Sequence, residues 1–303
     1  MTQIHNPASS AGEASRVIGD DADALYRATG PIADPGALLA DFIARSAAYR
    51  ETHSGILDVS YGPAADQLLD IFLPQRGSAA APVHIFIHGG YWYQFGKDEW
   101  SFVAKALTNA GAIVIVPRYS LCPKVVIAQI VEQMRTMLEW VWRNICQYGG
   151  DRDQIFVSGH SAGGHLAMEL MLTDWHGDYG LTEDVIKGVA AISGLYDLRP
   201  IRDTYVQEQI GLSERDAERL SPLLRIGKPS TPLIVAVAES DPPGFHYQYE
   251  QLIERWRAAG ETPVALPIAR HNHLSELYEM GEANGQLALA IAAQMGLVIP
   301  GWT

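Results

Sequence analysis

The chain has 303 residues, of which 48% are hydrophobic and 19% are charged, as in a globular protein with a sizeable core. Its formal net charge of −13 at pH 7 argues against nucleic acid and anionic membrane surfaces as partners, because both are bound through a concentrated basic surface. No apolar run is long enough to span a bilayer, so a membrane protein is not expected.

The first 50 residues lie outside the main pattern of the chain. Residues 1–20 are rich in Ser, Ala and Asp and are expected to be loosely held, whereas residues 35–49 have the pattern of a helix. We therefore expect an N-terminal segment, 1–50, with a loose start and a cap or lid helix, followed by a main domain, 51–303. The N-terminus lacks a basic start and an apolar core, so no signal peptide is expected and the cytoplasm is the default location.

Short apolar runs bounded by Gly, Pro or His alternate with helical patterns along the main domain. Such runs are typical of strands buried on both faces, and the alternation predicts an α/β fold with a mostly parallel, eight-stranded sheet flanked by helices. A polar stretch at about 198–228 is expected to be an insertion that covers the top of the sheet. The expected strands are residues 56–60, 67–73, 82–87, 112–116, 154–158, 188–192, 232–238 and 263–268. The expected helices are residues 98–110, 125–147, 162–172, 246–259 and 276–294.

The two cysteines, Cys122 and Cys146, are too few for a disulfide framework. Cys146 falls in the helical pattern 125–147, where we expect a small buried side chain. It is therefore interpreted as structural.

A serine between two glycines occupies the junction of a strand and a helix. The sequence Gly159-His160-Ser161-Ala162-Gly163 follows the apolar run 154–158 and begins the helical pattern 162–172. Gly-x-Ser-x-Gly at such a junction is a nucleophile elbow, in which the glycines make room for a sharply turned serine. Backbone N–H groups at the helix N-terminus then favour developing negative charge. The alternative is an ordinary Gly/Ser turn, but the position between strand and helix favours Ser161 as a nucleophile.

A nucleophilic serine needs a base, and in this arrangement the chain order is Ser, then Asp or Glu, then His. His271 and His273 follow the last expected strand, in the loop where the base is needed. We prefer His273 because it directly precedes the next helix, and His271 is the alternative. The two histidines lack a third ligand motif, so no metal site and no cofactor are expected.

An acid that orients the base is expected at the end of the strand before the last. Asp241 follows the run 232–238 and lies between Ser161 and His273 in the chain. Its alternative role is to cap a turn before a proline. Glu239 is the nearest rival, but it is closer to the strand and less free to reach a loop histidine.

Acyl transfer also needs N–H donors for an oxyanion. One is expected from Ala162, the residue after the nucleophile. Others are expected from Gly89 and Gly90, in the Gly-containing loop that follows the run 82–87. A plain turn is the alternative, but this loop together with the elbow is more specific than either motif alone.

These motifs make the chain similar to the kynurenine formamidase (arylformamidase) branch of the α/β-hydrolases, which is related to hormone-sensitive-lipase-type esterases. The loop His88-Gly89-Gly90-Tyr91-Trp92 resembles the formamidase form of the lipase motif HGGG. The resemblance implies a triad of Ser161, Asp241 and His273. One departure is Leu274, where an aromatic residue is expected after the histidine. Further matching segments are residues 23–27, 119–123, 159–166, 193–198, 220–222 and 239–242, with Phe245 and Gln248.

The reaction implied by the resemblance is hydrolysis of a small acyl group from an aryl amide or ester, with N-formylkynurenine as the expected substrate. Aromatic residues beside the oxyanion loop and after the acid suggest a narrow aromatic site. Arg118, Arg199 and Arg202 are candidates to bind an amino-acid head group, and the sequence selects none of them. The expected substrate-binding residues are His88, Tyr91, Trp92, Tyr93, His160 and Phe245.

Two alternatives stay open at this stage. A short-chain aryl carboxylesterase, or another small amide or carbamate hydrolase, would use the same residues. A non-catalytic ligand-binding protein on the same fold is more remote, since the chain keeps all three triad positions. A homodimer is compatible with the sequence, which does not decide the oligomeric state.

Overall fold

The computed structural model describes residues 22–75, 80–228 and 230–301, and the expectation for residues 1–20 lies outside this range. Its centre is an eight-stranded sheet with the strand order β1-β2-β4-β3-β5-β6-β7-β8. β2 pairs antiparallel with both β1 and β4, and all other neighbours are parallel. The mostly parallel eight-stranded sheet is therefore confirmed. The strands are β1 (Gly55–Ser60), β2 (Leu68–Phe72), β3 (Ala81–Ile87), β4 (Ile113–Pro117), β5 (Gly150–His160), β6 (Ile186–Ile192), β7 (Leu233–Ala238) and β8 (Val264–Ile268).

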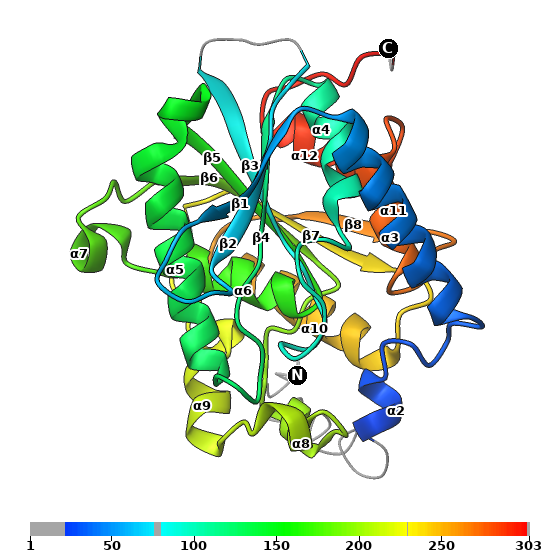
Figure 1. Ribbon diagram of the computed structural model, residues 1–303. Helices are drawn as coiled ribbons and strands as arrows, with labels where there is room; N and C mark the ends of the chain where they lie inside the picture. The colour runs from blue at the N-terminus through cyan, green and yellow to red at the C-terminus, as the bar shows by residue number, and fades with distance from the viewer. Residues whose placement is uncertain (1–21, 76–79, 229, 302–303) are drawn as a thin grey trace, which may run out of the picture.

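Each face of the sheet has its own apolar core, because successive side chains of a strand point to opposite faces. On β3, Val83 and Ile85 belong to one core and Phe86 to the other. Helices cover both faces (Figure 1). One layer contains α5 (Ile127–Asn144), α6 (Ala162–Met171) and α10 (Pro243–Ala258). The other contains α3 (Pro35–Thr52), η2 (Ser101–Ala104), α4 (Lys105–Asn109), α11 (Tyr278–Gly281) and α12 (Gln286–Gln294).

The stretch 198–228 and the start of the described chain meet at one end of the molecule. Figure 1 shows α2 (Ala22–Tyr26) and α8 (Gln207–Ile210) at the same end. The backbone N–H of Tyr205 donates to the Asp23 carboxylate, which joins the two segments across 182 residues of sequence. The remaining short elements are η3 (Ile145–Tyr148), α7 (Trp175–Tyr179), η4 (Pro200–Asp203), α9 (Glu214–Arg219), η5 (Pro222–Leu224) and η6 (Ser275–Leu277).

Two local expectations were wrong. Cys146 is exposed, because α5 ends at Asn144 and the chain tightens into the 3₁₀ turn η3, where Ile145 takes the buried position. The helix expected over 276–294 is divided into η6, α11 and α12. The break precedes Gly285, where a Cβ would lie 2.1 Å from the Glu279 carbonyl oxygen. No helix in the described ranges is both long and apolar enough to cross a membrane.

Candidate active site

Ser161 lies in a strained turn between β5 and α6. Its backbone has φ 56° and ψ −121°, a conformation that residues other than glycine rarely adopt, and its N–H donates to the Ile192 carbonyl at 2.9 Å. A Cβ on Gly159 would lie 1.9 Å from the Gly163 carbonyl oxygen, and a Cβ on Gly163 would lie 2.0 Å from that of Ile87. The two flanking glycines are therefore required by backbone contact, as the elbow motif predicts.

Asp241 and His273 meet beside this turn, because β5, β6, β7 and β8 are parallel neighbours whose carboxyl ends share one edge of the sheet. His273 Nδ1 is 2.7 Å from Asp241 Oδ1, and both side chains are buried. A carboxylate oxygen accepts, so Nδ1 carries the proton and Nε2 is left with its lone pair. The second oxygen, Asp241 Oδ2, accepts from Ser193 Oγ at 2.6 Å and from the Ala238 N–H at 3.1 Å.

The rival residues lie elsewhere. His271 binds Ser275 Oγ and Glu279 Oε1, each at 3.1 Å, and is partly exposed. Glu239 accepts the backbone N–H of Arg270 instead of approaching a histidine. The structure therefore brings Asp241 to His273 and not to His271.

The loop after β3 is held by His88. His88 Nδ1 donates to the Gly89 carbonyl at 2.8 Å, and the Tyr119 hydroxyl donates to the His88 carbonyl at 2.9 Å. In a trans peptide the N–H points opposite to the carbonyl, so this contact turns the Gly90 N–H away from His88. Among the described residues, the N–H groups of Gly90 and Ala162 donate to no other group. Both remain available to a ligand.

Strain continues along this loop. Tyr91, Trp92 and Phe95 have φ values of 48°, 60° and 71°, and Gly90 has 109°. Left-handed backbone at a residue with a side chain costs about 1–2 kcal/mol, so the surrounding contacts must hold the loop in place. One such contact is the hydrogen bond from the Tyr91 hydroxyl to the Tyr26 carbonyl, which ties the loop to the end of α2.

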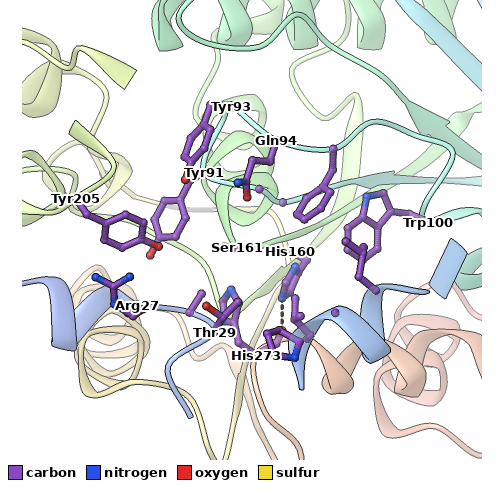
Figure 2. Close-up of a pocket in the computed structure, with 18 residues that line it drawn as sticks. Arg27, Thr29, Tyr91, Tyr93, Gln94, Trp100, His160, Ser161, Tyr205 and His273 are labelled. Carbon is purple, nitrogen blue, oxygen red and sulfur yellow. Dashed lines mark hydrogen bonds between the residues drawn. The ribbon is translucent and has the colours of Figure 1, made fainter. Parts of the chain in front are cut away.

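A cavity of about 330 Å³ opens over Ser161. Figure 2 shows Ser161, His160 and His273 near its middle, with Arg27 and Tyr205 on one side and Trp100 on the other. Within the described residues, Ser161 Oγ makes no hydrogen bond with His273. The lining residues are Arg27, Ala28, Thr29, Pro35, Gly36, Leu39, Gly89, Gly90, Tyr91, Tyr93, Gln94, Phe95, Trp100, His160, Ser161, Tyr205, His273 and Leu274.

Three residues expected to bind substrate lie behind the cavity wall. His88 stacks on Tyr119, with ring centroids 4.3 Å apart, and Trp92 donates to His165 Nδ1 at 3.3 Å. The Phe245 ring packs 4.3 Å from the His273 ring. All three side chains are fully buried: the backbone of the loop turns His88 and Trp92 into the core, whereas Phe245 lies on the buried side of α10. Burial lowers the pKa of His88 to about 4, which keeps this ring neutral near pH 7.

Two buried residues beside Asp241 and His273 were not expected. Ser193 directly follows β6, and its hydroxyl donates to Asp241. Because β6 ends at the same edge of the sheet as β5 and β7, strand order alone could have identified Ser193 as a site residue. Glu276 is fully buried, and neither carboxylate oxygen has a hydrogen-bond partner within the described part of the chain. Burial, followed by the nearby charge of Asp241, raises the pKa of Glu276 well above its ordinary value. Protonation of Glu276 is therefore favoured beside the Asp241 carboxylate.

His160, His273 and Glu276 are also the residues whose geometry could hold a metal, with ligand atoms within 4.8 Å of one another. His160 Nε2 already donates to the His273 carbonyl at 2.8 Å. His273 Nδ1 is engaged by Asp241. Binding of a metal through His160 Nε2 or His273 Nδ1 would break these bonds, so these two nitrogens fit the hydrogen-bonded arrangement better than a metal site.

Comparison with known proteins decides the family. The BD-FAE family model matches residues 69–255, which is more than half of the chain. The kynurenine formamidase of Danio rerio is 34% identical over 252 residues, which cover 82% of this chain and 84% of that protein. The kynurenine formamidase of Salmo salar is 32% identical over 80% of this chain and 82% of that protein. The chain belongs to the kynurenine formamidase family.

Solved structures confirm the α/β-hydrolase fold of this kynurenine formamidase family member. A protein from Silicibacter sp. TM1040, provisionally described as a thioesterase, superposes with a TM-score of 0.80 at 26% identity, over 90% of this chain and 100% of that one. The carboxylesterase EstE1 superposes with a TM-score of 0.70 at 21% identity, over 90% of this chain and 99% of that one. The named relatives are formamidases and esterases, and the protein is a hydrolase.

The arginines that the sequence suggested for binding an amino-acid head group do not line the cavity. Arg118, Arg199 and Arg202 are all absent from its lining. Arg199 instead forms a bidentate pair with Asp197. Arg27, which the sequence did not single out for this role, lines the cavity.

Proposed function

We propose that the protein is a serine hydrolase of the arylformamidase type, which cleaves N-formylkynurenine to kynurenine and formate. The observation that carries this proposal is the 2.7 Å bond between Asp241 and His273, beside the strained Ser161 in one cavity. The family supports the choice of a formamide. The cavity is at the small end of the range of about 300–1,000 Å³ for ligand sites, and its aromatic lining suits an aryl group.

The first half of the reaction forms a formyl-enzyme. Ser161 Oγ attacks the formamide carbon while His273 Nε2 takes the hydroxyl proton. Asp241 holds the ring in the tautomer that leaves Nε2 free, and it stabilises the imidazolium that forms. The C–N bond then breaks, and His273 returns its proton to the departing aryl amine.

The oxyanion of the tetrahedral intermediate needs donors that are already in place. We assign this role to the loop N–H groups of Gly89 and Gly90 together with Ala162, at the N-terminus of α6. A Cβ on Gly89 would lie 2.9 Å from the Ser161 Cβ, so this glycine is in direct contact with the nucleophile. His88 acts as a positioning residue, because it fixes the Gly89–Gly90 peptide.

The second half releases formate. A water molecule gives a proton to His273 Nε2 and adds to the formyl carbon, and the second intermediate is held by the same donors. Ser161 leaves as the alcohol with the proton from His273, which restores the enzyme. The cycle uses neither a metal nor a cofactor, so EDTA is expected to leave the rate unchanged.

The experiment that tests this proposal compares kcat/KM for N-formylkynurenine and p-nitrophenyl acetate, with Ser161→Ala as the control. A formamide value several decades higher is the expected result. The esterases among the solved neighbours favour a second candidate, a short-chain aryl carboxylesterase. A preference for the ester would establish that candidate and reject the formamidase.

A further inference from the structure

Among the described residues that line the cavity over Ser161, Arg27 is the only one with a fixed charge. We propose that Arg27 binds a carboxylate on the leaving-group part of the substrate and selects aryl amides or esters that carry this carboxylate over those that lack it. This inference rests on the proposed serine hydrolase function, and it adds a residue that determines specificity. It does not require the acyl group to be formyl.

The guanidinium of Arg27 is positioned by contacts from two segments. Its central carbon lies 4.4 Å above the centre of the Tyr205 ring, and its NH2 atom is 3.5 Å from Asp23 Oδ2. The backbone N–H of Tyr205 donates to the other oxygen of Asp23, so aspartate, arginine and tyrosine form one unit. A ring face beneath a guanidinium fixes its plane and leaves its edge donors free.

The remaining hydrogen-bonding capacity of Arg27 suits a carboxylate. A guanidinium has five N–H donors in a fixed fork, which matches the two oxygens of a carboxylate. The Arg27 guanidinium pairs with the Asp23 carboxylate at a long N–O distance of 3.5 Å. Both side chains are more than a third exposed. Such an exposed pair is weak and leaves most of the donors available.

The charge of the whole protein makes a local cation important. A chain with a net charge of −13 repels an anion in solution, and salt screens this repulsion beyond about 8–10 Å. Inside the cavity, Arg27 can act at short range, because the described lining residues include no aspartate or glutamate. A carboxylate on the substrate is therefore favoured at this point.

The side chains that line the cavity differ on the two sides of Ser161. Figure 2 shows Arg27 and Tyr205 together on one side of Ser161 and His273, and Trp100 on the other. The first side also carries the Tyr91 and Tyr93 rings. An aryl leaving group directed toward Arg27 can lie against these rings with its carboxylate at the guanidinium. This geometry would orient the scissile carbonyl on Ser161.

The test uses substrate pairs that differ only in charge. N-formylkynurenine is compared with its carboxamide, which keeps the α-ammonium and replaces the carboxylate by an uncharged group of the same shape, and the readout is the ratio of the two kcat/KM values. Arg27→Gln is expected to lower this ratio about 10- to 100-fold, mainly through KM of the substrate that carries the carboxylate. Arg27→Lys should retain part of the preference, since it keeps the charge without the fork.

Arg199→Gln is the matched control, because Arg199 is a similarly exposed arginine that pairs with an aspartate but does not line the cavity. Its ratio should equal that of the wild type. Thermal melting of each variant checks that the fold is intact. An unchanged ratio in folded Arg27→Gln, or an equal loss in Arg199→Gln, would overturn the proposal.

A second substrate pair separates this inference from the formamidase proposal. The esters 3-acetoxybenzoate and 3-acetoxybenzamide carry the same charge difference on a phenol leaving group. If the wild type cleaves the esters but no formamide, the formamidase proposal fails, and the ester ratio still decides the role of Arg27. If it cleaves neither, binding of L-kynurenine and its carboxamide to Ser161→Ala decides it, and equal affinities would reject the role.

Discussion

Residues near the carboxyl ends of the strands and residues at the mouth of the cavity differ in burial and in the structural elements that position them. The first group, here called the sheet-end cluster, consists of Ser161, Ser193, Asp241, His273 and Glu276, all at most 7% exposed. The second, the pocket rim, consists of Arg27, Tyr93 and Tyr205. The rim residues are partly exposed, and Arg27 retains 48% of its side-chain surface.

The two groups also depend on different contacts. The sheet-end cluster is placed by parallel strands whose hydrogen bonds leave little freedom in register. The rim joins α2, the loop after β3 and the stretch after η4, through a few side-chain contacts. The sheet therefore positions the residues proposed to react, whereas segments joined by few contacts position the residues proposed to select the substrate. Changes in the cluster should alter kcat, and changes in the rim should alter the choice of substrate.

The largest expected effect is that of Ser161→Ala. Loss of the nucleophile should lower kcat at least about 10⁴-fold, while the fold stays intact because alanine retains the backbone of the turn. A fluorophosphonate should label the wild type covalently and leave the variant unlabelled, as mass spectrometry would show. Full activity in the variant would reject the mechanism.

The variants His273→Ala and His271→Ala test which histidine belongs to the cluster. The first should lower kcat about 10³- to 10⁴-fold, because His273 is the histidine that Asp241 orients beside Ser161. The second should change kcat less than about threefold, since His271 contacts Ser275 and Glu279. Steady-state kinetics on both variants would decide, and the reverse order would exchange their roles.

Glu276→Gln tests whether the buried acid is neutral. The unfolded carboxyl titrates near 4.5, whereas burial keeps the folded one protonated to a higher pH. Between these pKa values only the unfolded state loses its proton, so stability falls as pH rises, by about 1.4 kcal/mol per pH unit. Glutamine cannot ionise.

The unfolding free energy of Glu276→Gln relative to the wild type should therefore rise as the pH increases above about 5, in urea titrations. A difference that stays constant with pH would mean that Glu276 is ionised in the folded protein.

Ser193→Ala has the smallest expected effect. It removes the 2.6 Å hydrogen bond to Asp241 but leaves the Ala238 N–H in place, so kcat should fall about tenfold. Ser158→Ala is the control, because this buried serine binds His84 and does not touch Asp241. Equal losses in the two variants would show that burial of any serine matters rather than the contact with Asp241.

The sheet and the central site residues could be predicted because their signals are local. Eight apolar runs mark eight strands, and the elbow needs only five neighbouring residues. Asp241 and His273 then follow from strand order, since parallel strands end at one edge. The same reasoning could not orient side chains within a loop. Trp92 turns into the core because of positive φ, which sequence does not display at a non-glycine residue.

The rim could not be predicted, for a different physical reason. Arg27 reaches the cavity because Asp23 accepts the N–H of Tyr205, a contact between residues 182 positions apart. No periodicity or motif specifies such docking. Glu276 was likewise interpreted only as a helix start, because it is buried beside His160, Ser193 and Asp241, which are distant from it in the chain.

The left-handed backbone at Tyr91, Trp92 and Phe95, and the turn at Ser161, connect stability with evolvability. Each strained position stores free energy that a relaxed loop would release, so variants that relax the loop should melt at higher temperature and turn over more slowly. Selection for heat tolerance alone would therefore erode activity in this loop first. The rim carries no such left-handed backbone at Arg27, Tyr93 or Tyr205, and is the part of the site where new substrates can be acquired at little thermodynamic cost.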